Sequence, residues 1–341
     1  MPLKAPSSTS IDAIHAKVHA RRAEMREKEK LAHLCELKGI ANLAAELYPE
    51  QGIQDHRHLQ KRLAEDSLMS LDWIMDFLGG REFKLFSWLL RRYQIENIKV
   101  VFRGFHGKRQ PSEIEPHLVK TPPDFALPYD NMITAPNTAK FVDLVPDYPL
   151  GRAVRQAILL YNRKNKPFFF DAALDRAFYV RLVEMIRGSY SPQVRSCMPL
   201  LMMEVGIYLI MLTLRARNNY EAAFDDISPV LKVDFGLPMG VLQNIYSAGS
   251  AAEAARGLPI AFRAAITDKV ESIDDIERML MTHLYRQANR TFYAAGVALS
   301  AAIAFFYLKR NELANLVRLS EAYHYGLKPE EMKRILVPPV E

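Results

Sequence analysis

The alternation of apolar and polar positions along this chain of 341 residues is typical of helices. Within the segment 82–103, the apolar side chains that fall near one helical face are Phe83, Phe86, Leu90, Tyr93 and Ile98. This spacing is that of an amphipathic helix. The sequence has no alternating Val, Ile and Thr runs bounded by Asn-Gly or Asp-Gly turns, so an all-β fold is disfavoured. The pattern predicts an all-α fold.

Capping residues and helix breakers give the predicted boundaries. Ser10 can cap a first helix that runs to Gly39, and Pro111 and Pro329 stand where helices would begin, because a proline ring presets the first turn. Further helices are predicted at 40–47, 59–78 (one or two helices), 82–103, 150–164, 170–187, 199–218, 238–247, 260–267, 273–309 and 311–322. Six of the 20 prolines lie between positions 120 and 150, which indicates a connection between larger units.

One segment of the chain recurs without a gap. Residues 90–119 align with residues 308–337, at an offset of 218 positions. The identical pairs include Arg92/Arg310, Asn97/Asn315, His106/His324, Pro111/Pro329, Glu113/Glu331 and Val119/Val337. A duplication of this kind indicates a repeat architecture, and repeat architectures usually present surfaces for partners.

A third and more diverged copy lies between these two. An offset of 106 aligns three pairs, Asp171/Glu277, Leu174/Leu280 and Tyr179/Tyr285. Arg103 then aligns with Arg215 at an offset of 112, and the two offsets together restore 218. The sequence therefore predicts three similar helical units, at 1–120, 121–232 and 233–341, each about the size of a small domain.

Composition places the chain among ordinary globular proteins, with 49% hydrophobic and 25% charged residues. Its two cysteines, Cys35 and Cys197, cannot form a disulfide framework and are predicted to be buried free thiols in a reducing cytoplasm. The first ten residues contain Pro and Ser but no apolar core, so no signal peptide is predicted there.

Two apolar runs raise the question of a membrane span. The run 291–308 has no charge and meets the lower length limit for a spanning helix, but six of its residues are Ala. Its repeat partner around 83–90 contains Lys84, Ser87 and Trp88, which favours a buried core helix and no membrane span. The run 199–214 is interrupted by Glu204, for which a structural hydrogen bond is favoured over a catalytic role.

Motifs for nucleotide, metal or nucleophilic chemistry are absent from the sequence. The segment 104–108 offers two glycines and a lysine, but at the wrong spacing for a phosphate-binding loop, and no GxGxxG, HExxH, CxxC or GxSxG motif occurs. His15 and His19 are four residues apart without a third ligand nearby, so a solvated helix face is favoured over a zinc site. The run 55–58 is likewise interpreted as a charged helix start. No catalytic residue, cofactor or metal is predicted.

The positive charge is concentrated in one region. Between positions 81 and 110 eight basic residues stand against two acidic ones, which equals the net charge of +6 for the whole chain. The candidate interface residues are Arg103, His106, Lys108 and Arg109, with His324 in the second copy. Nucleic-acid binding is disfavoured, because the interleaved aromatics have helical core spacing and no recognition motif accompanies them. A docking surface for a protein and a merely solvated face both remain open.

At these segments the sequence resembles a known family, the central-stalk C subunits of V/A-type rotary ATPases, which are similar to the d subunit of the vacuolar proton pump. The resemblance is carried by the runs 96–104, 311–318 and 326–331, with Leu336 and Val337. Leu174, Asp175, Arg176, Tyr179 and the run 214–217 match the middle unit, and the opening helix is also of the family type. The sequence departs from the family pattern at Gly206 and Leu209, where Asp and Asn are usual, and around Leu313 in the third unit.

The resemblance implies a funnel of three helical domains around a pseudo-threefold axis. It implies a non-catalytic rotor protein, cytoplasmic and peripheral on the membrane, whose partners are the coiled-coil axle and the membrane proteolipid ring. Such a protein transmits torque for proton or sodium transport and needs no cofactor. The alternative is a soluble α-helical scaffold unrelated to rotary ATPases.

Overall fold

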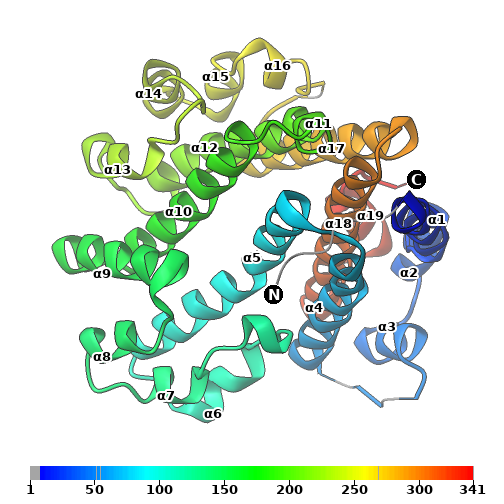
Figure 1. Ribbon diagram of the computed structural model, residues 1–341, viewed down its shortest axis with the longest axis horizontal. Coiled ribbons are helices and arrows are strands. Elements are labelled where there is room, and N and C mark those ends of the chain that lie inside the picture. The colour runs from blue at the N-terminus through cyan, green and yellow to red at the C-terminus, as the bar shows by residue number, and fades with distance from the viewer. Residues whose placement is uncertain (1–7, 51, 54, 268, 341) are drawn as a thin grey trace. The chain divides into compact units, whose positions relative to one another are not determined.

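The computed structural model describes residues 8–50, 52, 53, 55–267 and 269–340, and within them the chain is helical without a β-strand (Figure 1). The predicted all-α fold is confirmed. The longer helices are α1 (Ser8–Glu24), α4 (His56–Asp72), α5 (Gly80–His106), α9 (Arg152–Lys164), α10 (Pro167–Arg187), α12 (Met198–Asn218), α17 (Ile273–Ala294) and α18 (Ala298–His324). The shorter α-helices are α2 (Glu29–Cys35), α3 (Ile40–Leu47), α6 (Pro111–Ile114), α7 (Tyr129–Ile133), α8 (Thr138–Asp143), α11 (Pro192–Ser196), α13 (Phe224–Leu231), α14 (Met239–Ser247), α15 (Ala251–Arg256), α16 (Ile260–Arg263) and α19 (Pro329–Ile335).

Two predicted helices are broken at positions that periodicity does not reveal. The helix expected up to Gly39 stops at Glu24 and restarts as α2, because Lys28 has a left-handed φ of 46° and the N–H of Arg26 is bonded to the Glu312 carboxylate, 2.6 Å away. The break expected near position 310 lies instead at 295–297, between α17 and α18. There the carbonyl of Ala295 contacts the His15 imidazole, 3.1 Å away.

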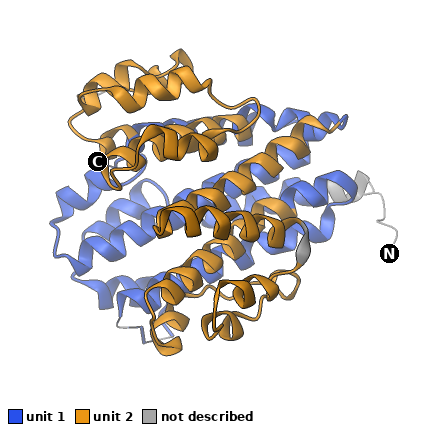
Figure 2. Cartoon of the chain, turned by 90° about the vertical axis from the view of Figure 1, so that its left-hand side faces the viewer, with its two compact units in different colours: residues 1–86, 190–200, 277–341 blue, residues 87–189, 201–276 orange. Residues whose placement is uncertain are grey.

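Two compact units make up the chain (Figure 2). Unit 1 contains residues 1–86, 190–200 and 277–341, and unit 2 contains residues 87–189 and 201–276. The proline-rich stretch 120–150 belongs to unit 2 and folds into short helices, among them α7 and α8. Asn137 caps α8 by accepting a hydrogen bond from the N–H of Lys140. This bond gives a partner to one of the backbone N–H groups that the first turn of a helix leaves unpaired.

The core of unit 1 is built around α18, which packs against α1, α4 and α11. All residues from Ala298 to Leu308 are buried, which confirms the core interpretation for this part of the run 291–308. In unit 2, α10 packs against α9 and α13, and the rings of Phe102 and Phe170 stack with centroids 3.6 Å apart. Among the described helices, α12 is long and apolar enough to cross a membrane, and 67% of that stretch is buried within the protein, as in a core helix.

Helix boundaries recur at the offsets found in the sequence. Both α5 and α18 have 27 residues, and they begin at Gly80 and Ala298. Between them, α11 and α12 together run from Pro192 to Asn218, interrupted at Cys197. Pro199, the second residue of α12, lacks the N–H that an unbroken helix would use, which accounts for the interruption. The division into three units and their threefold arrangement remain predictions.

Candidate subunit interface

Asn97 on α5 ties this helix to the segment that follows α6. Its side chain is 1% exposed; Nδ2 donates to the carbonyl of Val119 at 2.7 Å, and Oδ1 accepts from the N–H of Val119 at 3.0 Å. Between these two residues Pro111 opens α6, and the N–H of Gln110 donates to the Glu113 carboxylate at 2.9 Å. The chain is thus held at both ends of the turn that carries Arg103–Arg109.

The end of α18 is built in the same way, 218 positions later. Asn315 donates to the carbonyl of Val337 at 2.8 Å and accepts from its N–H at 2.9 Å. Pro329 opens α19, and the N–H of Lys328 donates to Glu331 at 2.9 Å. The repeated residues of the sequence are therefore the ones that fix the backbone. We call the paired bonds of Asn97 and Asn315 the asparagine clamps.

Four of the predicted interface residues share the first turn, in unit 2. Arg103 donates from Nε to Asp171 at 3.1 Å, His106 Nδ1 lies 2.6 Å from the Tyr161 hydroxyl, and Arg109 donates to Glu113 at 3.2 Å. The side chain of Lys108 is exposed and makes no hydrogen bond or ion pair within the described part of the chain. His324, the fifth, occupies the matching position in unit 1 and stacks on His56 with ring centroids 3.9 Å apart.

The two turns differ in backbone strain and in charge. Lys108 has a φ of 51°, a conformation that costs a residue with a Cβ about 1 kcal/mol. The equivalent residue of the second turn is Gly326, with a φ of 70°, for which this conformation carries no steric penalty. At the position of Arg103 the second turn has Glu321. The basic character is therefore a property of the first turn alone.

Behind the first turn lies a cluster of charged side chains between α5 and α10. Lys99, only 3% exposed, bridges Glu96 at 3.1 Å and Asp175 at 2.5 Å. Burial raises the pKa of Asp171 to about 6, and the nearby cations Arg103 and Lys99 limit the rise. Burial would also raise the pKa of Glu96, but its cation neighbours, Lys99 first, hold it at about 2. The cluster anchors Arg103 to α10.

Glu204 has the structural role favoured by the sequence. It lies on α12, is 5% exposed, and accepts a hydrogen bond from the Tyr179 hydroxyl at 3.2 Å. The hydrogen bond predicted for this carboxylate is therefore made with a tyrosine of α10.

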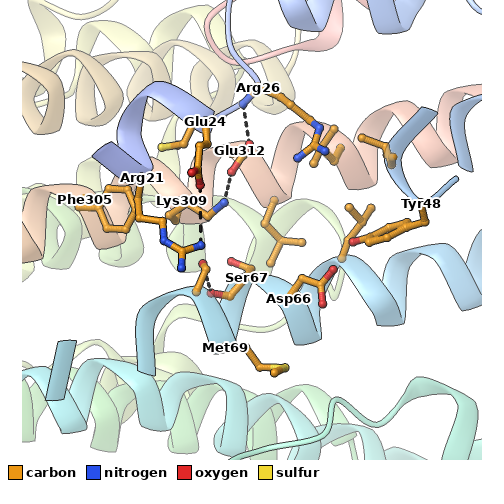
Figure 3. Close-up of a pocket in the computed structure, with 16 residues that line it drawn as sticks. Arg21, Glu24, Arg26, Tyr48, Asp66, Ser67, Met69, Phe305, Lys309 and Glu312 are labelled. Atoms are coloured by element: carbon orange, nitrogen blue, oxygen red, sulfur yellow. Dashed lines mark hydrogen bonds and ion pairs between the residues drawn. The ribbon is translucent and has the colours of Figure 1, made fainter. Parts of the chain in front are cut away.

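A cavity of about 520 Å³ in unit 1 was not signalled by the sequence (Figure 3). Residues of α1, α3, α4 and α18 line it, among them Asp66, Met69 and Phe305. Most of its charged groups are paired, including Arg21 with Glu24 at 3.7 Å and Lys309 with Glu312. A cavity whose charges are mostly paired presents little unbalanced charge to a ligand. Any ligand would therefore be selected by steric fit more than by electrostatic attraction.

The histidine pair of α1 is held by contacts inside unit 1. His15 approaches the carbonyl of Ala295, and His19 lies against the ring of Phe292 with centroids 4.4 Å apart. Both side chains are half-buried, so the helix face predicted to be solvated is only partly so here. Burial, followed by the proximity of His15, lowers the pKa of His19. Among the residues that the structure describes, no group of three or more His, Cys, Asp or Glu side chains could hold a metal ion.

Comparison with known proteins gives matches over nearly the whole chain. The model of the family described as "ATP synthase (C/AC39) subunit" matches residues 14–335. The C subunit of the A-type ATP synthase of Haloferax volcanii is 23% identical over 278 residues, which cover 77% of this chain and 76% of that protein. The C subunit of the A-type ATP synthase of Halorubrum lacusprofundi is 29% identical over 112 residues, which cover 33% of this chain and 32% of that protein.

Proposed function

Because the chain belongs to the family of ATP synthase (C/AC39) subunits, we propose that it is the central-stalk component that couples the axle of a V/A-type rotary ATPase to the membrane proteolipid ring. The resemblance found in the sequence is thereby confirmed at the level of the family. The C subunit of an A-type ATP synthase is a structural component of the stalk and not the catalytic one. Its place in a membrane-associated complex agrees with the expected peripheral location.

A protein that transmits torque must resist twisting, and the described helices have features that provide rigidity. The first eleven residues of α18 are all buried, and close-packed interiors have low compressibility. The asparagine clamps add two hydrogen bonds from one side chain at the end of α5 and again at the end of α18. Both features support a rigid coupling element.

We assign the contact with another rotor subunit to the first turn, around Lys108. The observation that carries this assignment is the strained backbone of Lys108, which the second turn avoids with Gly326. Backbone strain of about 1 kcal/mol at an exposed residue is a feature that clusters at functional positions. Arg103 and Arg109 are paired with Asp171 and Glu113, so the exposed ammonium of Lys108 is the charge of this turn that suits an acidic partner.

The test is reassembly of the full chain with the purified axle and proteolipid ring across a salt series. Replacing both Lys108 and Arg109 by Glu is expected to make the complex dissociate at lower salt than the wild type, because exposed charges act mainly through steering and screening. The melting temperature should stay unchanged, since both side chains are exposed.

A matched control makes the same change in charge elsewhere in unit 2, at the exposed residues Lys140 and Arg256. It should leave assembly intact. If the control and the turn variant are equally sensitive to salt, the effect comes from net charge and not from the turn. If the turn variant assembles as the wild type does, the turn is solvated and makes no contact with a rotor subunit. Failure of the wild-type chain to join the axle and ring at all would contradict the proposed function itself.

A further inference from the structure

Helix α9 of unit 2 has an exposed basic face that the proposed function does not use. Its opposite side is buried through Val154, Ala157 and Ile158. The exposed residues on and just after the helix are Arg152, Arg155, Gln156, Leu159, Asn162, Arg163, Asn165 and Lys166. No acidic residue occurs in α9 itself. Because residues four and seven positions apart share a side, the positions 152, 156, 159 and 163 form one stripe along the helix.

This stripe begins at a cavity of about 250 Å³ between α9 and α10. Apolar side chains form part of its lining, including the ring of Trp88, which stacks on Phe178 with centroids 5.7 Å apart. Three arginines also line it, Arg152, Arg176 and Arg181. Its one acidic lining residue is Glu184, which Arg181 pairs at 3.1 Å. The cavity is thus lined by apolar side chains and by three arginines against one glutamate.

Leu159 lies further along the same stripe and is 61% exposed. An exposed leucine among basic residues increases the affinity of a surface for a partner with apolar as well as acidic groups. The combination of a basic stripe, one exposed apolar residue and a cavity partly lined by apolar side chains matches the anatomy of a docking surface with a buried anchor.

We propose that the exposed face of α9, together with this cavity, binds an acidic segment of a partner protein that inserts one apolar side chain beside Trp88. Charge complementarity selects an acidic partner, because the face carries four basic residues and no acidic one. The cavity favours a protein over a membrane surface, since a lipid headgroup has no apolar side chain to place beside Trp88. Nucleic acid is disfavoured because no aromatic side chain on this face is exposed for base stacking.

Binding can be measured through Trp88, because the chain contains only two tryptophans. In the Trp73→Phe variant of the full chain, Trp88 is the single reporter, and it is 6% exposed against the cavity. The probe is a synthetic helical peptide of 13 residues, the length of α9, made of Glu and Ala with one central Leu. We expect saturable binding with a change in Trp88 fluorescence, weakened about tenfold when the Leu is replaced by Ala. A peptide with Lys in place of Glu should not bind.

Two variants separate the charge from the cavity. Replacing Arg152 and Arg163 by Glu should weaken binding by about tenfold or more and remove its salt dependence. Replacing Ala177, which lines the cavity, by Leu should weaken binding while the salt dependence stays. The control with Glu at Lys140 and Arg256 should bind as the wild type does.

The proposal is overturned if the acidic peptide does not bind, or if it binds equally to the Arg152 and Arg163 variant. It is also overturned if vesicles containing phosphatidylglycerol, or poly(U), bind through these arginines while the peptide does not. The variant with Glu at Lys108 and Arg109 should retain peptide binding. The proposal for this surface and the proposal for the rotor contact can therefore be refuted independently of each other. Melting curves establish that each variant is folded.

Discussion

The ends of α5 and α18 have the same internal construction and different surfaces. Each is held by an asparagine clamp, followed by a proline that opens a short helix and a glutamate that caps it. The first end presents Lys108 and Arg109 where the second presents Gly326 and Leu327. The comparison teaches that burial preserves the residues that position the backbone, whereas exposed positions can diverge toward different partners.

Packing between the short helix and the end of the long one also differs between the two regions. A Cβ on Gly104 would lie 2.2 Å from the Cδ1 of Ile114, so the first turn leaves no room for a side chain there. The second region has Ala322 at the same position, 2% exposed, and the more flexible Met332 in place of the isoleucine. The pair Gly104 and Ile114 and the pair Ala322 and Met332 each fill the space between the short helix and the long helix of their own region.

The segment predicted to be the middle copy has apolar packing at the position that corresponds to the clamp. Leu209 stands where the other copies have the clamp asparagine, and its Cδ1 would lie 2.7 Å from a Cβ on Gly236. Gly206, the second departure from the family pattern, is covered by the ring of Phe262, which would lie 2.2 Å from an added Cβ. At both positions apolar packing against a residue of the same unit takes the place of polar contacts.

The largest effect is expected from removing a clamp. Replacing Asn315 by Leu leaves the buried N–H of Val337 without its partner, whereas the carbonyl keeps the Nδ2 of Asn311 at 2.6 Å. The change should lower the free energy of unfolding by about 3 kcal/mol. The same change at Asn97 should cost a similar amount, because it takes the partner from both the N–H and the carbonyl of Val119, although Val119 is only half-buried. Urea denaturation measures both, with the exposed Asn244→Leu as the control. A loss below about 1 kcal/mol at either site would show that the two ends are not equivalent.

Replacing Gly104 and Ile114 by the residues of the second region, Ala and Met, tests whether the two members of each pair are fitted to one another. Gly104→Ala should lower the free energy of unfolding by about 2 kcal/mol, since overpacking outweighs the better helix propensity of Ala. Adding Ile114→Met recreates the pair of the second region and should recover more than half of that loss. A double-mutant cycle by urea denaturation gives the coupling between the two positions. Strictly additive effects would contradict the fitted-pair interpretation.

The charge cluster behind the first turn should give that region its own pH dependence. Because burial raises the pKa of Asp171 from 3.8 to about 6, the folded state binds this proton more tightly than the unfolded state. Its contribution to stability is full below pH 3.8 and is lost as the pH rises through 6, by about 2 kcal/mol after allowance for partial exposure. Urea denaturation from about pH 4 to 7 should show this loss in the wild type but not in Asp171→Asn.

Glu96 provides a control of opposite sign for that experiment. Its pKa lies at about 2 in the folded protein, below the ordinary 4.5, so its contribution is present above pH 4.5 and is lost as the pH falls. Between about pH 3 and 5 the advantage of the wild type over Glu96→Gln should therefore grow with pH. If the two variants shifted in the same direction, the assignment of the cluster would be wrong.

The smallest effect is expected at the strained lysine. Lys108→Gly should leave the fold stable or raise the free energy of unfolding by about 0.5 kcal/mol, because relief of the left-handed strain outweighs the flexibility gained by the unfolded chain. Gly326→Lys should lower it by about 1 kcal/mol. Thermal melting of the two variants measures the asymmetry. If Lys108→Gly destabilises the protein, the backbone at position 108 is not strained in the wild type.

The sequence by itself determined the helical class, the recurrence at 218 positions and the family, because periodicity and the repeated capping residues are local signals. The match of Asn97 to Asn315 and of Pro111 to Pro329 indicated equivalent helix ends before any contact was known. The α3 boundaries, Ile40–Leu47, follow the predicted segment because Gly39 precedes it and Pro49 follows shortly after. The candidate interface residues were predicted from the concentrated charge and from the histidine that both copies keep, His106 and His324.

Tertiary structure decided what depends on contacts between distant residues. The break after α1 follows from the bond between Arg26 and Glu312, which are 286 positions apart. The pairing of Arg103 with Asp171, the cavity beside Trp88 and the clamp function of the repeated asparagines likewise arise from packing across helices. Such interactions leave no periodic trace in a single sequence, because the free energy that selects them comes from burial and pairing between segments.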